Sequence, residues 1–134
     1  MKIGFVASCF DLGPHAGHMA MLEEASQHCD ILYVGLHVNP KLERAEKNKP
    51  VQSVSERFLQ VSGCRYVDRV IPYETESELL ELLKLLPIDI RFLGEDYKDK
   101  RFTGDEFNMQ LHFCKRQHSV SSSGLRLLIK GKKK

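Results

Sequence analysis

Short, continuous apolar runs recur along the chain, and turn residues bound each of them. This pattern is typical of strands that are buried on both faces of a parallel sheet. We expect strands over Ile3–Ala7, Ile31–Val38, Val67–Tyr73, Ile88–Leu93 and, with a weaker apolar pattern, Gln110–Lys115.

The stretches between these runs carry apolar residues at helical spacing. They predict helices over Gly17–His28, from Ser53 onward, over Ser77–Leu86, and from Ser121–Ser123 through Ile129. The alternation predicts an α/β fold, a doubly wound parallel sheet with right-handed crossovers. We expect a single domain over residues 1–130 and a basic tail over 131–134. Ligands of such sheets bind beyond the carboxyl ends of the strands.

Composition narrows the class of protein. The 134 residues are 42% hydrophobic and 28% charged, with a formal net charge of +2, which suits a globular domain and is too weakly basic for a dedicated nucleic-acid binder. No window approaches the roughly 18 apolar residues that cross a bilayer, so no membrane span is predicted. Four scattered cysteines without an export signal predict reduced thiols and a cytoplasmic location.

The loop after the first predicted strand runs from Cys9 to His18 and opens directly into a helix. Backbone N–H groups and the helix dipole favour a phosphate there, and Gly17 lets an anion approach the backbone closely. His15 and His18 could donate hydrogen bonds to phosphate oxygens. Alternatively, the histidines merely decorate the helix start, or bind a structural zinc with Cys9. Since no further ligands stand at recognisable spacing, no protein metal site is predicted.

Three later segments carry polar residues that could contact a nucleotide or could belong to ordinary solvent-exposed loops, turns and helix caps. Lys47 and Lys49 lie in a polar stretch that is either a solvated loop or a lid over a triphosphate. Asp96 follows the fourth predicted strand, where it would contact a ribose or base, or belong to a plain turn. Ser121–Ser123 are natural N-caps of the last helix, and the same groups suit the outer phosphates.

Two motifs resemble the cytidylyltransferase-like nucleotidyltransferases. The string FDLGPHAGH resembles their HxGH signature, although three residues instead of two separate Asp11 from His15. The family's later segment reads Arg, three residues, an aliphatic and three Ser/Thr, and the chain from Arg116 to Ser123 matches it at full spacing. The resemblance extends over nearly the whole chain.

This resemblance implies a Rossmann-like nucleotidyltransferase fold, a nucleoside triphosphate with Mg²⁺ bridging its phosphates, and a homodimer. It implies catalytic roles for His15, His18, Lys47, Lys49 and Arg116. It implies nucleotide contacts by Cys9, Phe10, Asp11, Gly17, Asp96, Ser121, Ser122 and Ser123.

The segments around Arg57 and Arg65 resemble glycerol-3-phosphate cytidylyltransferase, which implies that both arginines bind the acceptor. The predicted reaction is transfer of CMP from CTP to a phosphorylated small molecule, for which glycerol 3-phosphate is the leading candidate. The acceptor phosphate needs no general base, because its second pKa is about 6. The alternatives are ATP as donor; phosphoethanolamine, phosphocholine, a sugar phosphate or FMN as acceptor; a non-catalytic nucleotide-binding module; and a structural domain without nucleotide affinity.

Overall fold

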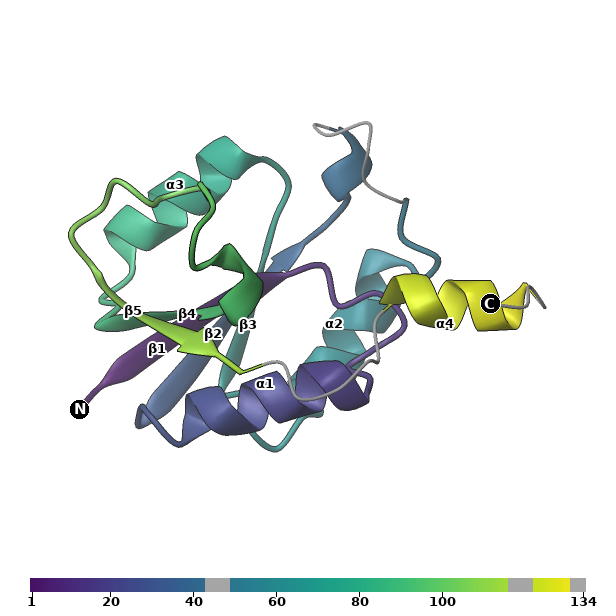
Figure 1. Ribbon diagram of the computed structural model, residues 1–134, viewed down its shortest axis with the longest axis horizontal. Helices are drawn as coiled ribbons and strands as arrows, with labels where there is room; N and C mark the ends of the chain where they lie inside the picture. Colours follow the sequence, from purple (N-terminus) through teal and green to yellow (C-terminus); the bar gives the residue numbers. More distant parts are fainter. Residues whose placement is uncertain (43–48, 116–121, 131–134) are drawn as a thin grey trace.

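A five-stranded parallel sheet with the strand order β3-β2-β1-β4-β5 forms the centre of the molecule, which confirms the predicted doubly wound fold (Figure 1). The structure is a computed structural model and describes residues 1–42, 49–115 and 122–130. The strands are β1 (Ile3–Ser8), β2 (Ile31–His37), β3 (Arg69–Tyr73), β4 (Ile90–Gly94) and β5 (Gln110–Cys114).

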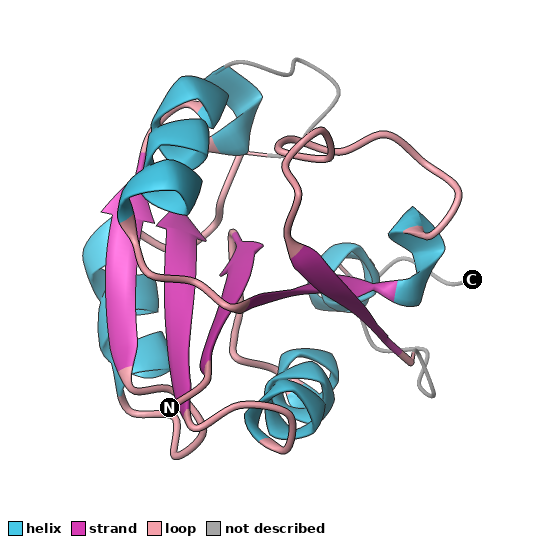
Figure 2. Ribbon diagram, turned by 90° about the vertical axis from the view of Figure 1, so that its left-hand side faces the viewer, coloured by secondary structure: helices cyan, strands magenta, loops and turns pink. Residues whose placement is uncertain are grey.

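Helices cover both faces of this sheet (Figures 1 and 2). A capping box begins the helix predicted from Ser53 onward, because the Glu56 N–H donates to Ser53 Oγ at 3.1 Å and the Ser53 N–H donates to Glu56 Oε1 at 2.8 Å. The helices are α1 (Ala16–Ser26), α2 (Val54–Ser62), α3 (Glu76–Leu85) and α4 (Ser122–Ile129), and the 3₁₀ turns are η1 (Pro40–Leu42) and η2 (Glu95–Tyr97).

The predicted element boundaries are correct to within one or two residues in most places. The start of β3 differs because the chain still turns at Val67, whose N–H donates to the Cys64 carbonyl at 3.1 Å. Asp68 then accepts a hydrogen bond from the Leu32 N–H at 2.8 Å, so its carboxylate takes the place of a strand partner. The paired strand therefore begins only at Arg69.

The core consists of one apolar cluster on each face of the sheet. Val6 of β1 packs with Leu22 of α1 and Val61 of α2, whereas its neighbour Phe5 packs with Leu79 of α3 on the opposite face. Successive strand residues point to opposite faces, so a strand covered on both sides is apolar throughout. This explains the unbroken apolar runs in the sequence.

Two predictions from composition can be compared with the described part of the chain. Within it, every helix is too short or too polar to reach across a bilayer. The four cysteines form no disulfide, and Cys64 and Cys114 are buried, as expected for reduced thiols packed as small apolar side chains.

Arg57 of α2 is the largest fully buried side chain and is only 2% exposed. Its Nη1 donates to the carbonyls of Cys9 at 3.0 Å and His37 at 2.8 Å, and its Nη2 donates to the Val38 carbonyl at 2.6 Å. Its Nε donates to the Gln52 carbonyl at 3.1 Å. The guanidinium thus ties α2 to the chain leaving β1 and β2. A contact with an acceptor stays a prediction.

Replacing Arg57 with Met is expected to lower the free energy of unfolding by about 3 kcal/mol, because several buried carbonyls lose their donor. Urea denaturation measures this loss. The matched control is Arg65→Met, since Arg65 is exposed and contacts only the Tyr66 ring face among the described interactions. Equal stability of the two variants would contradict the structural part assigned to Arg57.

Candidate functional site

The loop between β1 and α1 lies at the carboxyl edge of the sheet and has an unusual backbone. Phe10 and Leu12 have φ angles of 54° and 57°, in the left-handed region that residues other than glycine rarely adopt. Phe10 is 1% exposed, and its ring lies 4.8 Å from that of His18 between centroids. Surrounding structure therefore fixes a backbone that is costly by itself, which is common at functional sites.

His15 and His18 form a reciprocal cap at the start of α1. The N–H groups of Gly17 and His18 donate to His15 Nδ1 at 3.0 and 3.3 Å, and the His15 N–H donates to His18 Nδ1 at 3.2 Å. The rings stack with centroids 3.7 Å apart. Because both Nδ1 atoms accept, the proton of each neutral ring is on Nε2. Each histidine therefore has an Nε2–H donor while capping the helix.

Gly13 lies against the histidine pair at a position that has no room for a side chain. A Cβ atom at this position would lie 2.3 Å from His18 Nδ1 and 2.5 Å from the His15 backbone nitrogen. The chain therefore passes directly against the histidine pair, and only glycine fits. Despite the longer spacing from Asp11, His15 still occupies the N-cap of α1.

Asp11 joins this loop to the segment before α2. Its side chain is 2% exposed, and its two oxygens accept hydrogen bonds from the N–H groups of Val51 at 2.8 Å and Gln52 at 3.0 Å. In return, the Leu12 N–H donates to Gln52 Oε1 at 2.9 Å. Lys49, which is exposed, lies immediately before this anchored segment. No local pattern links residues 11 and 52, so sequence reasoning missed Gln52.

Other predicted site residues lie around the same loop. Asp96 is exposed and lies in η2, after β4. Its Oδ1 lies so close to Gly94 that a Cβ atom added at Gly94 would be 2.7 Å from this oxygen. The Cys9 thiol accepts from Arg57 at 3.3 Å. Arg65 lines an open groove of ≈ 450 Å³ together with Pro14, which precedes the histidine cap.

Several remaining predicted residues lie in the segments 43–48 and 116–121. Lys47, Arg116 and Ser121 lie outside the described residues. Helix α4 begins at Ser122 as expected, at the same end of the sheet as the loop before α1 (Figure 1). The structure therefore joins the first loop to the anchored segment beside Lys49, and it places Asp96 after β4, at the same carboxyl edge of the sheet. Convergence of all four predicted segments stays a prediction.

Similarity to known proteins agrees with this geometry. The family described as Cytidylyltransferase-like matches residues 5–127. The bifunctional protein HldE of Campylobacter jejuni is 33% identical over 133 residues, which cover 98% of this chain and 28% of that protein. HldE of Helicobacter hepaticus is 35% identical over 107 residues, covering 79% of this chain and 22% of that protein. The chain thus spans about a quarter of the length of these curated relatives.

Solved structures share the fold at low identity. A lipopolysaccharide core biosynthesis protein from Thermoplasma volcanium has a TM-score of 0.68 at 21% identity, with 90% of this chain and 99% of that chain covered. A putative nicotinate-nucleotide adenylyltransferase from Vibrio parahaemolyticus has a TM-score of 0.64 at 20% identity, with 99% and 90% covered. The finer resemblance to glycerol-3-phosphate cytidylyltransferase is not supported, because the curated relatives named above are HldE proteins. The match over residues 5–127 shows that this chain belongs to the cytidylyltransferase-like family of nucleotidyltransferases.

Proposed function

We propose that this chain transfers a nucleotidyl group from a nucleoside triphosphate to a phosphorylated small molecule and releases pyrophosphate. The observation that carries the proposal is the reciprocal cap of His15 and His18. It combines two neutral Nε2–H donors with the positive end of the α1 dipole, and both favour a polyphosphate. Family membership supports the same reaction class.

In the proposed reaction, an oxygen of the acceptor phosphate attacks the α-phosphorus in line. A new P–O bond forms as the bond to the β-phosphate oxygen breaks, and pyrophosphate leaves with that electron pair. The ionised acceptor loses no proton, so the residues act by positioning and by stabilising charge. We assign His15 and His18 to the α- and β-phosphates. Lys47 and Lys49 would lie on a loop that closes over the triphosphate. The β- and γ-phosphates would be bound by Arg116 with Ser121, Ser122 and Ser123.

Mg²⁺ fits this site as an ion that arrives with the nucleotide. Asp11 is the acidic residue of the first loop, and both of its carboxylate oxygens already accept hydrogen bonds from main-chain N–H groups. Phosphate oxygens and water would then hold the ion, which is usual for Mg²⁺ on a nucleotide. The ion would neutralise charge on the triphosphate. A homodimer and a cytoplasmic location stay predictions.

We propose ATP as the donor in place of CTP. Among proteins with this fold, one is described as a putative adenylyltransferase and another, a pantoate-β-alanine ligase from Francisella tularensis, as a complex with β-γ ATP. The burial of Arg57 weakens the case for glycerol 3-phosphate. The resemblance to glycerol-3-phosphate cytidylyltransferase assigned this arginine to acceptor binding, but its N–H groups donate to main-chain carbonyls. A sugar phosphate is the first acceptor to test, given the fold neighbour described as acting in lipopolysaccharide core biosynthesis.

A panel of pyrophosphate-release assays with Mg²⁺ tests this function. ATP and CTP are each combined with a sugar phosphate, glycerol 3-phosphate, phosphoethanolamine, phosphocholine and FMN. We expect release with ATP and a sugar phosphate. Pyrophosphate release with CTP but not with ATP would contradict the proposal that ATP is the donor. Nucleotide binding without release from any pair would indicate a non-catalytic module, and absence of nucleotide binding would overturn the proposal.

His18→Ala is expected to lower kcat by about a hundred- to a thousandfold, as for loss of a single donor to developing charge. Two further variants separate its functions. His18→Asn keeps an acceptor near the Nδ1 position for the His15 N–H, whereas His18→Gln keeps a donor near Nε2. We expect the Gln variant to retain more activity and the Asn variant to retain more thermal stability.

The reverse order, with Asn the more active variant, would assign His18 to capping alone. Steady-state kinetics and thermal unfolding of the same preparations provide the comparison.

Gly13→Ala is expected to lower kcat by at least about tenfold, because its Cβ would push the His18 ring out of position. The matched control is Gly63→Ala, where the nearest atoms to the new Cβ lie at 3.5 and 3.6 Å. That variant should keep its activity. Full activity of Gly13→Ala would mean that the placement of His18 tolerates more movement than the structure indicates.

A further inference from the structure

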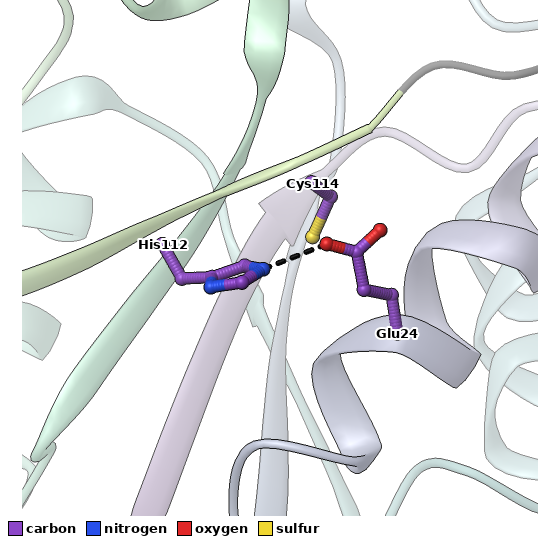
Figure 3. Close-up of side chains that lie close together, drawn as sticks. All are labelled: Glu24, His112 and Cys114. Atoms are coloured by element: carbon purple, nitrogen blue, oxygen red, sulfur yellow. Dashed lines mark hydrogen bonds and ion pairs between the residues drawn. The ribbon is translucent and has the colours of Figure 1, made fainter.

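A second group of reactive side chains lies between α1 and β5 (Figure 3). Glu24 is in the last turn of α1, and His112 and Cys114 are on β5. Their potential ligand atoms all lie within 4.8 Å of one another, and Glu24 Oε2 is 2.7 Å from His112 Nε2. These three residues play no part in the proposed nucleotidyl transfer.

The fold explains why these side chains meet. His112 and Cys114 are separated by one strand residue, so both point to the face of β5 that α1 covers. Glu24 points from α1 toward them, as Figure 3 shows. The separation of 88 residues between Glu24 and His112 hides the group from any spacing motif, and the sequence analysis accordingly predicted no metal ligands.

We propose that Glu24, His112 and Cys114 bind a divalent transition metal ion, with Zn²⁺ as the ion that this donor set fits best. A carboxylate oxygen, an imidazole nitrogen and a thiolate sulfur are all common zinc ligands. Tetrahedral zinc with bonds of about 2.0–2.3 Å separates its ligand atoms by roughly 3.3–3.8 Å. The present arrangement reaches this geometry if the Glu24–His112 pair opens slightly and the thiol moves closer.

The surroundings hold the ligands in place and leave a way in. The Lys115 N–H donates to Glu24 Oε1 at 3.1 Å, which orients the carboxylate from behind. The His28 ring lies 4.2 Å from the His112 ring between centroids and restricts its movement. The side chains of His112 and Glu24 are 26% and 25% exposed, so an ion can reach them from solvent. Water can complete the coordination.

Binding would change the charge state of the buried thiol. Burial, followed by the negative charge of Glu24, raises the pKa of the Cys114 thiol to about 12, so the metal-free protein carries a proton on sulfur. A zinc ion takes thiolate, so that proton is released to solvent as the Zn–S bond forms. The ion also offsets the negative charge of Glu24. The bound metal would fasten the edge strand β5 to α1.

Titration of the metal-free full chain with Co²⁺ tests the site, because a thiolate ligand gives a characteristic sulfur-to-cobalt charge-transfer band. We expect one equivalent of Co²⁺ to produce this band together with the visible spectrum of a tetrahedral ion. One equivalent of Zn²⁺ should displace the cobalt and raise the unfolding temperature.

Variants assign the ligands. Cys114→Ser should abolish the charge-transfer band, and His112→Gln should weaken Zn²⁺ binding by at least about a hundredfold. The matched control is Cys29→Ser, a half-buried cysteine that is not in this group, and it should keep both properties. If Cys114→Ser fails to fold, the two partly exposed ligands still provide the test through His112→Gln and Glu24→Gln.

Absence of the thiolate band with the wild-type chain would overturn the proposal. So would Zn²⁺ binding that is unchanged in His112→Gln but lost in a His15→Ala, His18→Ala double variant, because the ion would then lie in the first loop. None of these outcomes depends on whether the chain transfers a nucleotide.

Discussion

Main-chain groups at the carboxyl edge of the sheet need partners that the strands do not supply, and two buried charged side chains provide them. The Arg57 guanidinium donates to carbonyls of the chain leaving β1 and β2, and the Asp11 carboxylate accepts N–H groups before α2. A buried charge is stable only when surrounded by such partners. The loops of the candidate site are therefore held together by the same contacts that satisfy their backbones.

This constraint explains the conformation of the first loop. Phe10 and Leu12 adopt left-handed φ angles that unsupported residues would leave, and Asp11 between them is anchored to Val51 and Gln52. These left-handed conformations lower the stability of the fold, and in return they fix the position at which α1 starts. In the proposed reaction the acceptor phosphate would already be ionised, so fixed donors would matter more than proton transfer, and a rigid cap suits that requirement.

Local patterns in the sequence predicted the elements of the fold and the histidine pair, because continuous apolar runs, helical spacing and the HxGH signature each depend on neighbouring residues. The contacts that give these residues their roles were not predictable in this way. Asp11 and Gln52 are separated by 41 residues, and Arg57 and Cys9 by 48, so folding alone brings them together. Sequence resemblance predicts an acceptor contact for Arg57, and it did not indicate that the same side chain is buried against main-chain carbonyls.

Helix α1 connects the two groups of side chains described here. Its first turn carries the histidine cap, and its last turn carries Glu24, which contacts His112 of β5 and the N–H of Lys115, the residue after β5. β5 leads directly into the segment that contains Arg116. The contact at Glu24 and the histidine cap therefore lie at opposite ends of the same 11-residue helix. The proposed ion between Glu24 and β5 would thus stabilise the helix that carries the histidine cap, without contact to the proposed nucleotide.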